Sequence, residues 1–241
     1  MIRSSIARGV SFLAAALLVV QPCFSFQAPL SDQSVREAYF LGQRNDNSTL
    51  SFFNPYIHRF ERPKTGPFVS EAEVYTPFVQ VVETSRLRAG NYSAQQASLD
   101  YRRGTDSIFV RVRIDFTPTY APPDFLATLV LPDGRPLPPV QRPNFARDFR
   151  IGLSQNDKWI EPLNTNHDLT DTNGLGHFPF DPDGYYSRSR PGPYSTGYVL
   201  TGWLVWLEFD AKDVASDSAT VEIFGPGDQH LIAAFDLAKL R

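Results

Sequence analysis

The sequence contains almost no cysteine, because Cys23 is the single one among its 241 residues. Cys23 falls in an N-terminal segment that we expect to be removed, which would leave a mature chain without any thiol. Such a chain has no disulfides, no zinc–thiolate site and no thiol nucleophile. An exported protein of this kind must be stable through its hydrophobic core alone.

The expected removal follows from the order of residues at the N-terminus. The segment "MIRSSIARG" carries Arg3 and Arg8 without an acidic residue, and "VSFLAAALLVV" and then "CFSF" follow it. Basic, apolar and small residues in this order are typical of a secretory signal peptide. The apolar segment is shorter than the roughly 20 residues that span a bilayer. We therefore expect a signal peptide over residues 1–25, cleavage after Ser25, and a secreted or periplasmic protein with no stable membrane span.

Two alternatives to this cleavage stay open. The apolar segment could be retained as a membrane anchor. Cys23 could instead carry a lipid, although Pro22 stands where a lipid-attachment motif needs a small residue.

The sequence also lacks an excess of basic residues. Its 23 Lys and Arg against 26 Asp and Glu give a net charge of -3. Removal of Arg3 and Arg8 leaves 21 basic residues (23 minus 2) against 26 acidic ones, which is a net charge of -5. Proteins that bind nucleic acid usually present clustered Lys and Arg to its phosphates. We therefore expect no nucleic-acid partner.

No familiar catalytic motif is present in the sequence. It contains no GxSxG nucleophile elbow, no HExxH zinc motif, no P-loop and no dinucleotide-binding fingerprint. We predict a protein that is not an enzyme, with no catalytic residue, no cofactor and no metal.

Acidic and histidine residues in the second half of the chain leave two alternatives open. His167 and His177 flank "DLTDTNGLG", but their spacing matches no metal-binding motif. An EF-hand alignment would place Leu169 and Phe180 where calcium-binding carboxylates are required. An irregular calcium site and a glycosidase-type carboxylate pair both stay open. The acids concerned are Asp168, Asp171, Asp181 and Asp183.

Helical signals are few. Ser34 followed by Glu37 is a helix-start signature, and we predict a short helix over residues 31–44 that ends near Gly42. The segment "NYSAQQASLDYRR" favours a helical turn, because its small and aromatic residues recur at helical spacing. Between these two segments we expect residues 45–67 to form an irregular arm packed on the protein surface.

Strand patterns are more frequent. The segment "EVYTPFVQVVETS" predicts a strand with Pro77 at an edge or a bulge. The alternation in "SIFVRVRIDFT" predicts a half-buried antiparallel strand with one wet face. The segment "YVLTGWLVWLEFD" is apolar on both faces, which predicts a central strand. Further strands are predicted in "DFLATLVLPDGRPL" and "DFRIGLSQND", and a terminal hairpin in "ATVEIFGPGDQHLIAAFDL".

Short strands separated by Pro and Gly turns predict an all-β fold, an antiparallel β-sandwich with a short N-terminal helical arm. We divide the chain into a signal peptide over 1–25, a helix and irregular arm over 26–67, and a sandwich domain over 68–241. Within this last domain, a long loop is predicted over about residues 164–198.

Several of these strands together resemble a known family. The segments "FVRVRIDF", "LATLVLPDGR", "GWLVWLEF" and "TVEIFGPGDQHLIAAFDL" are similar to strands of the immunoglobulin-like modules found on secreted bacterial proteins. The resemblance implies an immunoglobulin-like β-sandwich. It also implies a binding or structural module, because the family has no shared catalytic residues.

The long loop is the predicted site of function. Its part "GHFPFDPDGYYSRSRPGPYSTGY" combines Tyr and Arg with Gly, Pro and Ser, a composition typical of recognition loops. The alternative is that the aromatic side chains pack the loop onto its own domain, as in Ω-loops. The predicted ligand-binding residues are Tyr185, Tyr186, Arg188, Arg190 and Tyr194.

The sequence therefore predicts an exported, non-enzymatic binding or assembly module. Its partner would be an extracytoplasmic protein or glycan, bound by the Tyr/Arg-rich loop. The alternative is a carbohydrate-binding or carbohydrate-active protein with the same loop at the sugar site.

Overall fold

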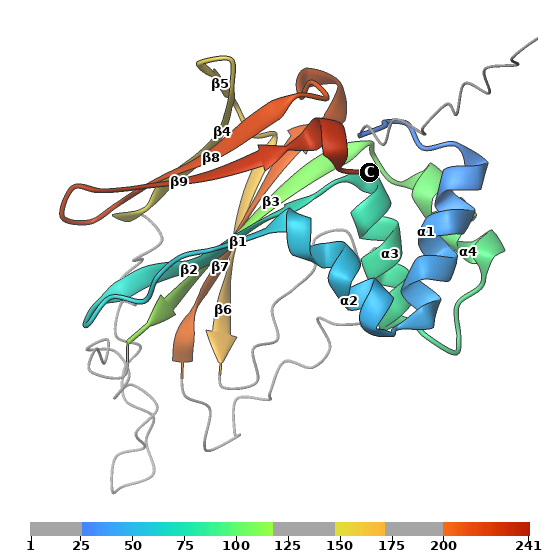
Figure 1. Ribbon diagram of the computed structural model, residues 1–241, viewed down its shortest axis with the longest axis horizontal. Helices are drawn as coiled ribbons and strands as arrows, with labels where there is room; N and C mark the ends of the chain where they lie inside the picture. The colour runs from blue at the N-terminus through green and yellow to red at the C-terminus, as the bar shows by residue number, and fades with distance from the viewer. Residues whose placement is uncertain (1–25, 118–147, 172–199) are drawn as a thin grey trace, which may run out of the picture.

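The computed structural model describes residues 26–117, 148–171 and 200–241. Figure 1 shows two stacked antiparallel sheets with helices gathered at one end of them. The helices in these ranges are α1 (Asp32–Arg44), α2 (Asn47–Phe53), α3 (Pro77–Leu87) and α4 (Ala94–Arg103). None of them is long and apolar enough to cross a membrane.

The larger sheet of the described residues has the strand order β1-β2-β3-β7-β6, and every neighbouring pair is antiparallel. Its strands are β1 (Ile57–Arg59), β2 (Pro67–Tyr75), β3 (Ser107–Phe116), β6 (Asn164–Asp171) and β7 (Leu200–Asp210). The smaller sheet has the order β5-β4-β8-β9. Its strands are β4 (Arg150–Gln155), β5 (Lys158–Ile160), β8 (Ser218–Gly225) and β9 (Gln229–Asp236).

The two sheets share one hydrophobic core. Val110 and Val112 of β3 and Leu207 of β7 belong to the same buried cluster as Leu153 of β4 and Ile223 of β8. Alternation along each strand turns these residues inward, because successive side chains point to opposite faces of a sheet. Burial of this apolar surface is the main source of stability for a chain that has no disulfide.

The helices form a second hydrophobic cluster of their own. Val35 and Ala38 of α1 pack with Phe78 and Val82 of α3 and with Ala97 of α4. The helices also lie beside the sheets in Figure 1, so they make up a substantial layer of the structure. The prediction of an all-β, immunoglobulin-like sandwich with a short helical arm is therefore wrong, and the fold is mixed α/β.

The largest local error concerns the segment around Pro77. Its predicted strand is a strand only up to Tyr75, and residues from Pro77 onward form α3. Thr76 is the N-cap of this helix and its side chain accepts a hydrogen bond from the Val79 amide. Proline is well suited to the first position of a helix, because its fixed φ is helical and the N–H it lacks would have no partner there.

The predicted irregular arm over 45–67 also contains regular structure. It holds α2, a short 3-10 turn over Asn54–Tyr56, strand β1 and the first residue of β2. The predicted loop over 164–198 begins with the eight residues of β6, which pairs with β7.

Other local predictions are confirmed. Helix α1 lies where it was expected, although Ser31 rather than Ser34 is its N-cap and the helix continues to Arg44. Helix α4 and strands β3 and β4 match their predicted segments, and β8 and β9 form the predicted hairpin. Strand β7 lies between β3 and β6 and is buried on both faces, as its apolar pattern predicts.

Candidate binding site

The residues predicted to bind a ligand lie outside the described residues. The same holds for the signal peptide, the strand predicted after Asp124, and two of the acids of the calcium alternative, Asp181 and Asp183. Asp168 and Asp171 belong to β6. The predicted ligand-binding role therefore stays a prediction for Tyr185, Tyr186, Arg188, Arg190 and Tyr194. The candidate site of the described residues is formed by other side chains.

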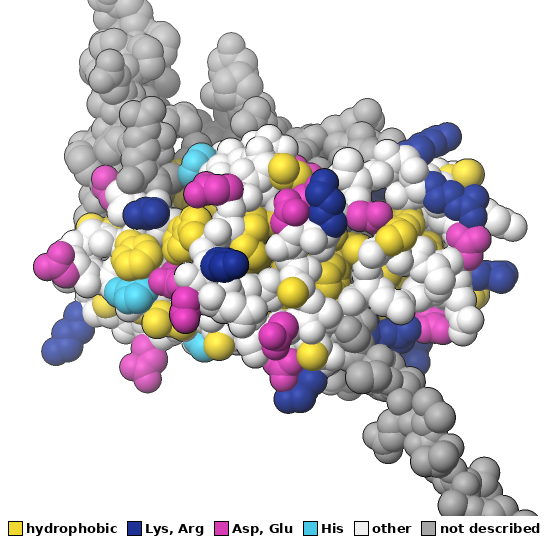
Figure 2. Space-filling model, turned by 90° about the horizontal axis from the view of Figure 1, so that it is seen from above, with side chains coloured by type: hydrophobic (Ala, Val, Ile, Leu, Met, Phe, Trp, Pro, Cys, Tyr) yellow, Lys and Arg dark blue, Asp and Glu magenta, His cyan; other side chains and the backbone are white. Residues whose placement is uncertain are grey.

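The candidate site is the outer face of the four-stranded sheet. Figure 2 looks down on this side of the molecule and shows apolar, histidine and acidic side chains close together on it. On β4, Leu153 is buried in the core, so Gly152 and Ser154 beside it face outward. Across the strands, Gly152 pairs with Glu222 of β8 and Glu222 pairs with Ile232 of β9.

Trp159 of β5 lies on this face, over the backbone of β4. A Cβ atom added to Gly152 would be 1.8 Å from Cζ2 of Trp159, so only glycine leaves room for the indole there. The guanidinium carbon of Arg150 lies 5.2 Å from the centroid of the Trp159 ring. Glycine and arginine together hold a partly exposed aromatic ring in one place on the sheet.

Glu222 is fixed beside this ring by two neighbours. The Ser154 hydroxyl donates a hydrogen bond of 2.7 Å to Glu222 Oε1, and His230 Nε2 lies 3.4 Å from Glu222 Oε2. The His230 ring is itself stacked on Phe224, with 4.4 Å between the centroids. An ionised carboxylate can accept about four hydrogen bonds, so Glu222 keeps acceptor capacity for a ligand.

An open depression of about 370 Å³ lies next to Glu222. Three hydroxyls, two amides and two carboxylates line it together with one apolar side chain. At its rim, Asn156 and Asp157 adopt positive φ values of 49° and 61° and close the two-residue turn between β4 and β5. The lining residues are Ser154, Gln155, Asn156, Asp157, Ser218, Thr220, Glu222 and Ile232.

Sequence reasoning predicted β4 and β8 but not this site. The alternation in "DFRIGLSQND" predicts that Ser154 faces outward. The sequence signal for the position of Trp159 is the Asn156–Asp157 turn. Asn and Asp tolerate positive φ, so this turn predicts a hairpin that returns Trp159 to the side of Ser154.

A second cluster of ionisable groups lies on the outer face of the five-stranded sheet. Arg111 of β3 forms an ion pair with Glu73 of β2, and its guanidinium lies 3.7 Å from Glu71. The same guanidinium lies 5.5 Å from the ring centroids of both Tyr75 and Trp206. The face of β3 that was predicted to be exposed to water is therefore largely covered at its centre. The cluster is internal to the fold rather than open to a ligand.

The pKa of Glu71 is raised in this cluster, because burial disfavours its charged form and the neighbouring Glu73 carboxylate repels its charge. The folded protein thus holds this proton more tightly than the unfolded chain. The contribution of Glu71 to stability is complete below its ordinary pKa of 4.5 and is lost as the pH rises through the raised pKa.

Replacing Glu71 with glutamine is therefore expected to raise the thermal unfolding midpoint at pH 7 and to leave it nearly unchanged at about pH 4. Glu73→Gln is the matched control and should lower the midpoint at pH 7, because Glu73 pairs with Arg111 and accepts a 2.6 Å hydrogen bond from Tyr75. Thermal unfolding followed by circular dichroism at a series of pH values measures the midpoints of both variants. A lower midpoint for Glu71→Gln at pH 7 would show that its charge stabilises the fold.

No family model, curated protein or solved structure matches the chain. Its function is therefore inferred from the chemistry of the described residues and from the sequence.

Proposed function

We propose that this protein is an exported, non-enzymatic module that binds carbohydrate on the outer face of its four-stranded sheet. The observation that carries the proposal is the Trp159 indole, held over Gly152 beside the fixed carboxylate of Glu222. Export is supported by the order of basic, apolar and small residues over 1–25. The Tyr/Arg-rich segment is a second predicted contact surface.

The chemistry of a sugar ring suits this arrangement. One face of many sugar rings presents C–H groups, while hydroxyls project around the edge. A partly exposed indole offers a flat apolar surface to that face. Beside it, Glu222 offers an acceptor, and Ser154 and Thr220 offer hydroxyls that both donate and accept. Binding sites for small molecules typically combine an apolar contact with a few placed polar groups in this way.

Binding rather than catalysis is favoured by the way Glu222 is held. The Glu222 carboxylate accepts a hydrogen bond from Ser154 and lies within ion-pair distance of His230. These contacts hold the carboxylate in one position, where its remaining acceptor capacity can serve a ligand. A glycosidase needs a second carboxyl group across the scissile bond, one of the pair acting as an acid with a raised pKa. Among the carboxyl groups of the described residues, the one with a raised pKa is Glu71 on the other sheet, beside Arg111.

The test is a screen of the purified protein against immobilised polysaccharides and an oligosaccharide array. Trp159→Ala is expected to weaken binding of any sugar found by about tenfold or more, because a truncated aromatic anchor typically costs this much. Glu222→Gln should weaken binding too. The matched control is Glu161→Gln, an exposed carboxylate directly after β5 that does not line the depression.

Three outcomes would contradict the proposal. Binding that survives both Trp159→Ala and Glu222→Gln places the sugar elsewhere. Release of reducing sugar during incubation would make the protein a hydrolase. No binding to any glycan, together with capture of a protein partner, would favour the assembly role predicted from the sequence.

A further inference from the structure

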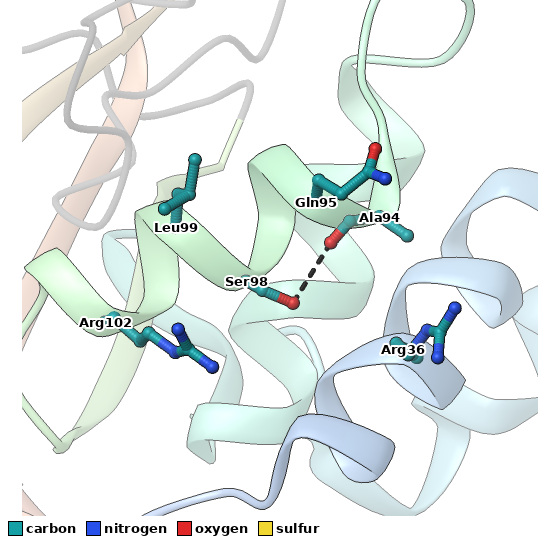
Figure 3. Close-up of a pocket in the computed structure, with 6 residues that line it drawn as sticks. All are labelled: Arg36, Ala94, Gln95, Ser98, Leu99 and Arg102. Carbon is teal, nitrogen blue, oxygen red and sulfur yellow. Dashed lines mark hydrogen bonds between the residues drawn. The ribbon is translucent and has the colours of Figure 1, made fainter.

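A second surface, separate from the sugar-binding face, lies between α1 and α4. The two helices run antiparallel, because Asp32 at the start of α1 forms a 2.8 Å ion pair with Arg102 near the end of α4. At the other end, the Tyr39 hydroxyl donates to the carbonyl oxygen of Tyr92, just before α4. Between them is an open groove of about 470 Å³. It is lined by Arg36, Ala94, Gln95, Ser98, Leu99 and Arg102 (Figure 3).

The groove is basic. Figure 3 shows the Arg36 and Arg102 guanidiniums on either side of the Ser98 hydroxyl, which donates back to the Ala94 carbonyl. Within the described ranges, Arg36 makes no ion pair or hydrogen bond. The Arg102 side chain keeps 62% of its surface exposed despite its pair with Asp32. None of the six lining side chains is acidic.

The groove also has apolar neighbours. Leu99 on α4 is 46% exposed, and Phe40 on α1, one turn after Arg36, is 58% exposed. Large apolar side chains on adjacent helices lie next to Arg36, which has no described ion-pair partner, and to Arg102, which pairs with Asp32 but stays largely exposed. This arrangement suits a ligand that has an apolar stripe with acidic residues beside it. Arginine forms two parallel hydrogen bonds with a carboxylate, which makes it the favoured residue for such contacts.

We propose that this groove binds an acidic amphipathic segment of a partner protein. The apolar side chains of the segment would contact Leu99 and Phe40, and its carboxylates would pair with Arg36 and Arg102. Helical segments commonly bind in grooves between two helices in this way. An acidic partner is expected because two of the six lining residues are arginines and none is acidic. The rest of the chain is acidic overall, so this groove differs in charge from the protein as a whole.

The test uses two fluorescein-labelled model helices of equal length in anisotropy titrations of the full chain. Both carry leucine at i, i+3, i+4 and i+7; one has glutamate beside the leucines and the other has lysine at the same positions. The protein is expected to bind the glutamate peptide, and Arg36→Glu should weaken this binding by about tenfold and strengthen binding of the lysine peptide.

The matched control is Arg44→Glu. Arg44 is an exposed arginine at the other end of α1, outside the groove, and pairs locally with Asp46. This variant should bind both peptides as the wild type does. The proposal is overturned if the wild type binds the lysine peptide as well as the glutamate peptide, if it binds neither, or if both variants lose the same affinity. Sugar binding should be unchanged in Arg36→Glu, which separates this proposal from that for the sheet.

Discussion

Replacing Arg111 with methionine is expected to lower the free energy of unfolding by about 3–5 kcal/mol, the usual cost of removing one partner of a buried ion pair. Methionine fills a similar volume but leaves the buried Glu73 carboxylate without its ion-pair partner. It also removes the cation that packs against Tyr75 and Trp206. Denaturant unfolding followed by tryptophan fluorescence measures the loss.

Arg113→Met is the matched control for this prediction. Arg113 lies two residues further along the same face of β3, and it pairs with Asp115 of its own strand. Its side chain is 31% exposed, against 17% for Arg111, so its loss should cost about 0–1 kcal/mol. Equal destabilisation by the two variants would contradict the claim that the Arg111 ion pair contributes more to stability than that of Arg113. Adding Glu73→Gln to Arg111→Met should recover part of the loss, because it removes the unpaired charge.

Replacing Phe78 with alanine is expected to cost about 3–5 kcal/mol, as is usual for a phenylalanine removed from a core. Phe78 is the second residue of α3 and is 2% exposed. Its ring lies 5.8 Å from that of Phe52 and 4.4 Å from the Arg241 guanidinium, which also pairs with Glu37 of α1. Its loss would leave a cavity where α1, α2 and α3 meet the end of the chain that follows β9.

Phe40→Ala provides the comparison for Phe78→Ala. Phe40 is also a helical phenylalanine, but it is 58% exposed, so its removal should change stability by no more than about 0.5 kcal/mol. Thermal and denaturant unfolding of both variants measure the difference. Similar losses at the two positions would mean that the helical cluster is not a true core.

The strands of this protein could be predicted because their signal is local. In β3, alternate residues such as Val110 and Val112 face the core, and in β7 both Trp203 and Leu204 are buried. Period-two patterns of this kind need no knowledge of the partner strand. The predicted turn after β8 is equally local, and the hairpin pairs Gly225 with Gln229 as expected.

Helices α2 and α3 were missed for a different reason, whereas α1 and α4 were predicted. Valines are enriched in strands, so Val79, Val81 and Val82 suggested a strand. Their burial outweighs this preference, because Val81 and Val82 belong to the helical cluster and Val79 belongs to the core of the sheets. The sequence signals that mark where these helices begin are their N-cap residues. Each helix starts after a residue whose side chain accepts a hydrogen bond from the first turn, and these residues are Ser31, Asp46, Thr76 and Ser93.

The candidate site depends on contacts that no single segment contains. The position of Trp159 over Gly152 requires the β4–β5 hairpin, and the place of Glu222 requires the pairing of β4 with β8. The same holds for the Glu73–Arg111 pair, which joins residues 38 positions apart. Sequence patterns indicate which face of a strand a residue occupies, but the register between distant strands decides which side chains meet.

The most direct test of carbohydrate binding on the four-stranded sheet is a chemical-shift titration of the ¹⁵N-labelled protein with an oligosaccharide that it binds. The Trp159 indole N–H and the amides of Ser154, Thr220 and Glu222 are expected to shift together, with one common dissociation constant. Shifts confined to residues 172–199 or to the α1–α4 groove, with the Trp159 indole unchanged, would contradict the proposed site.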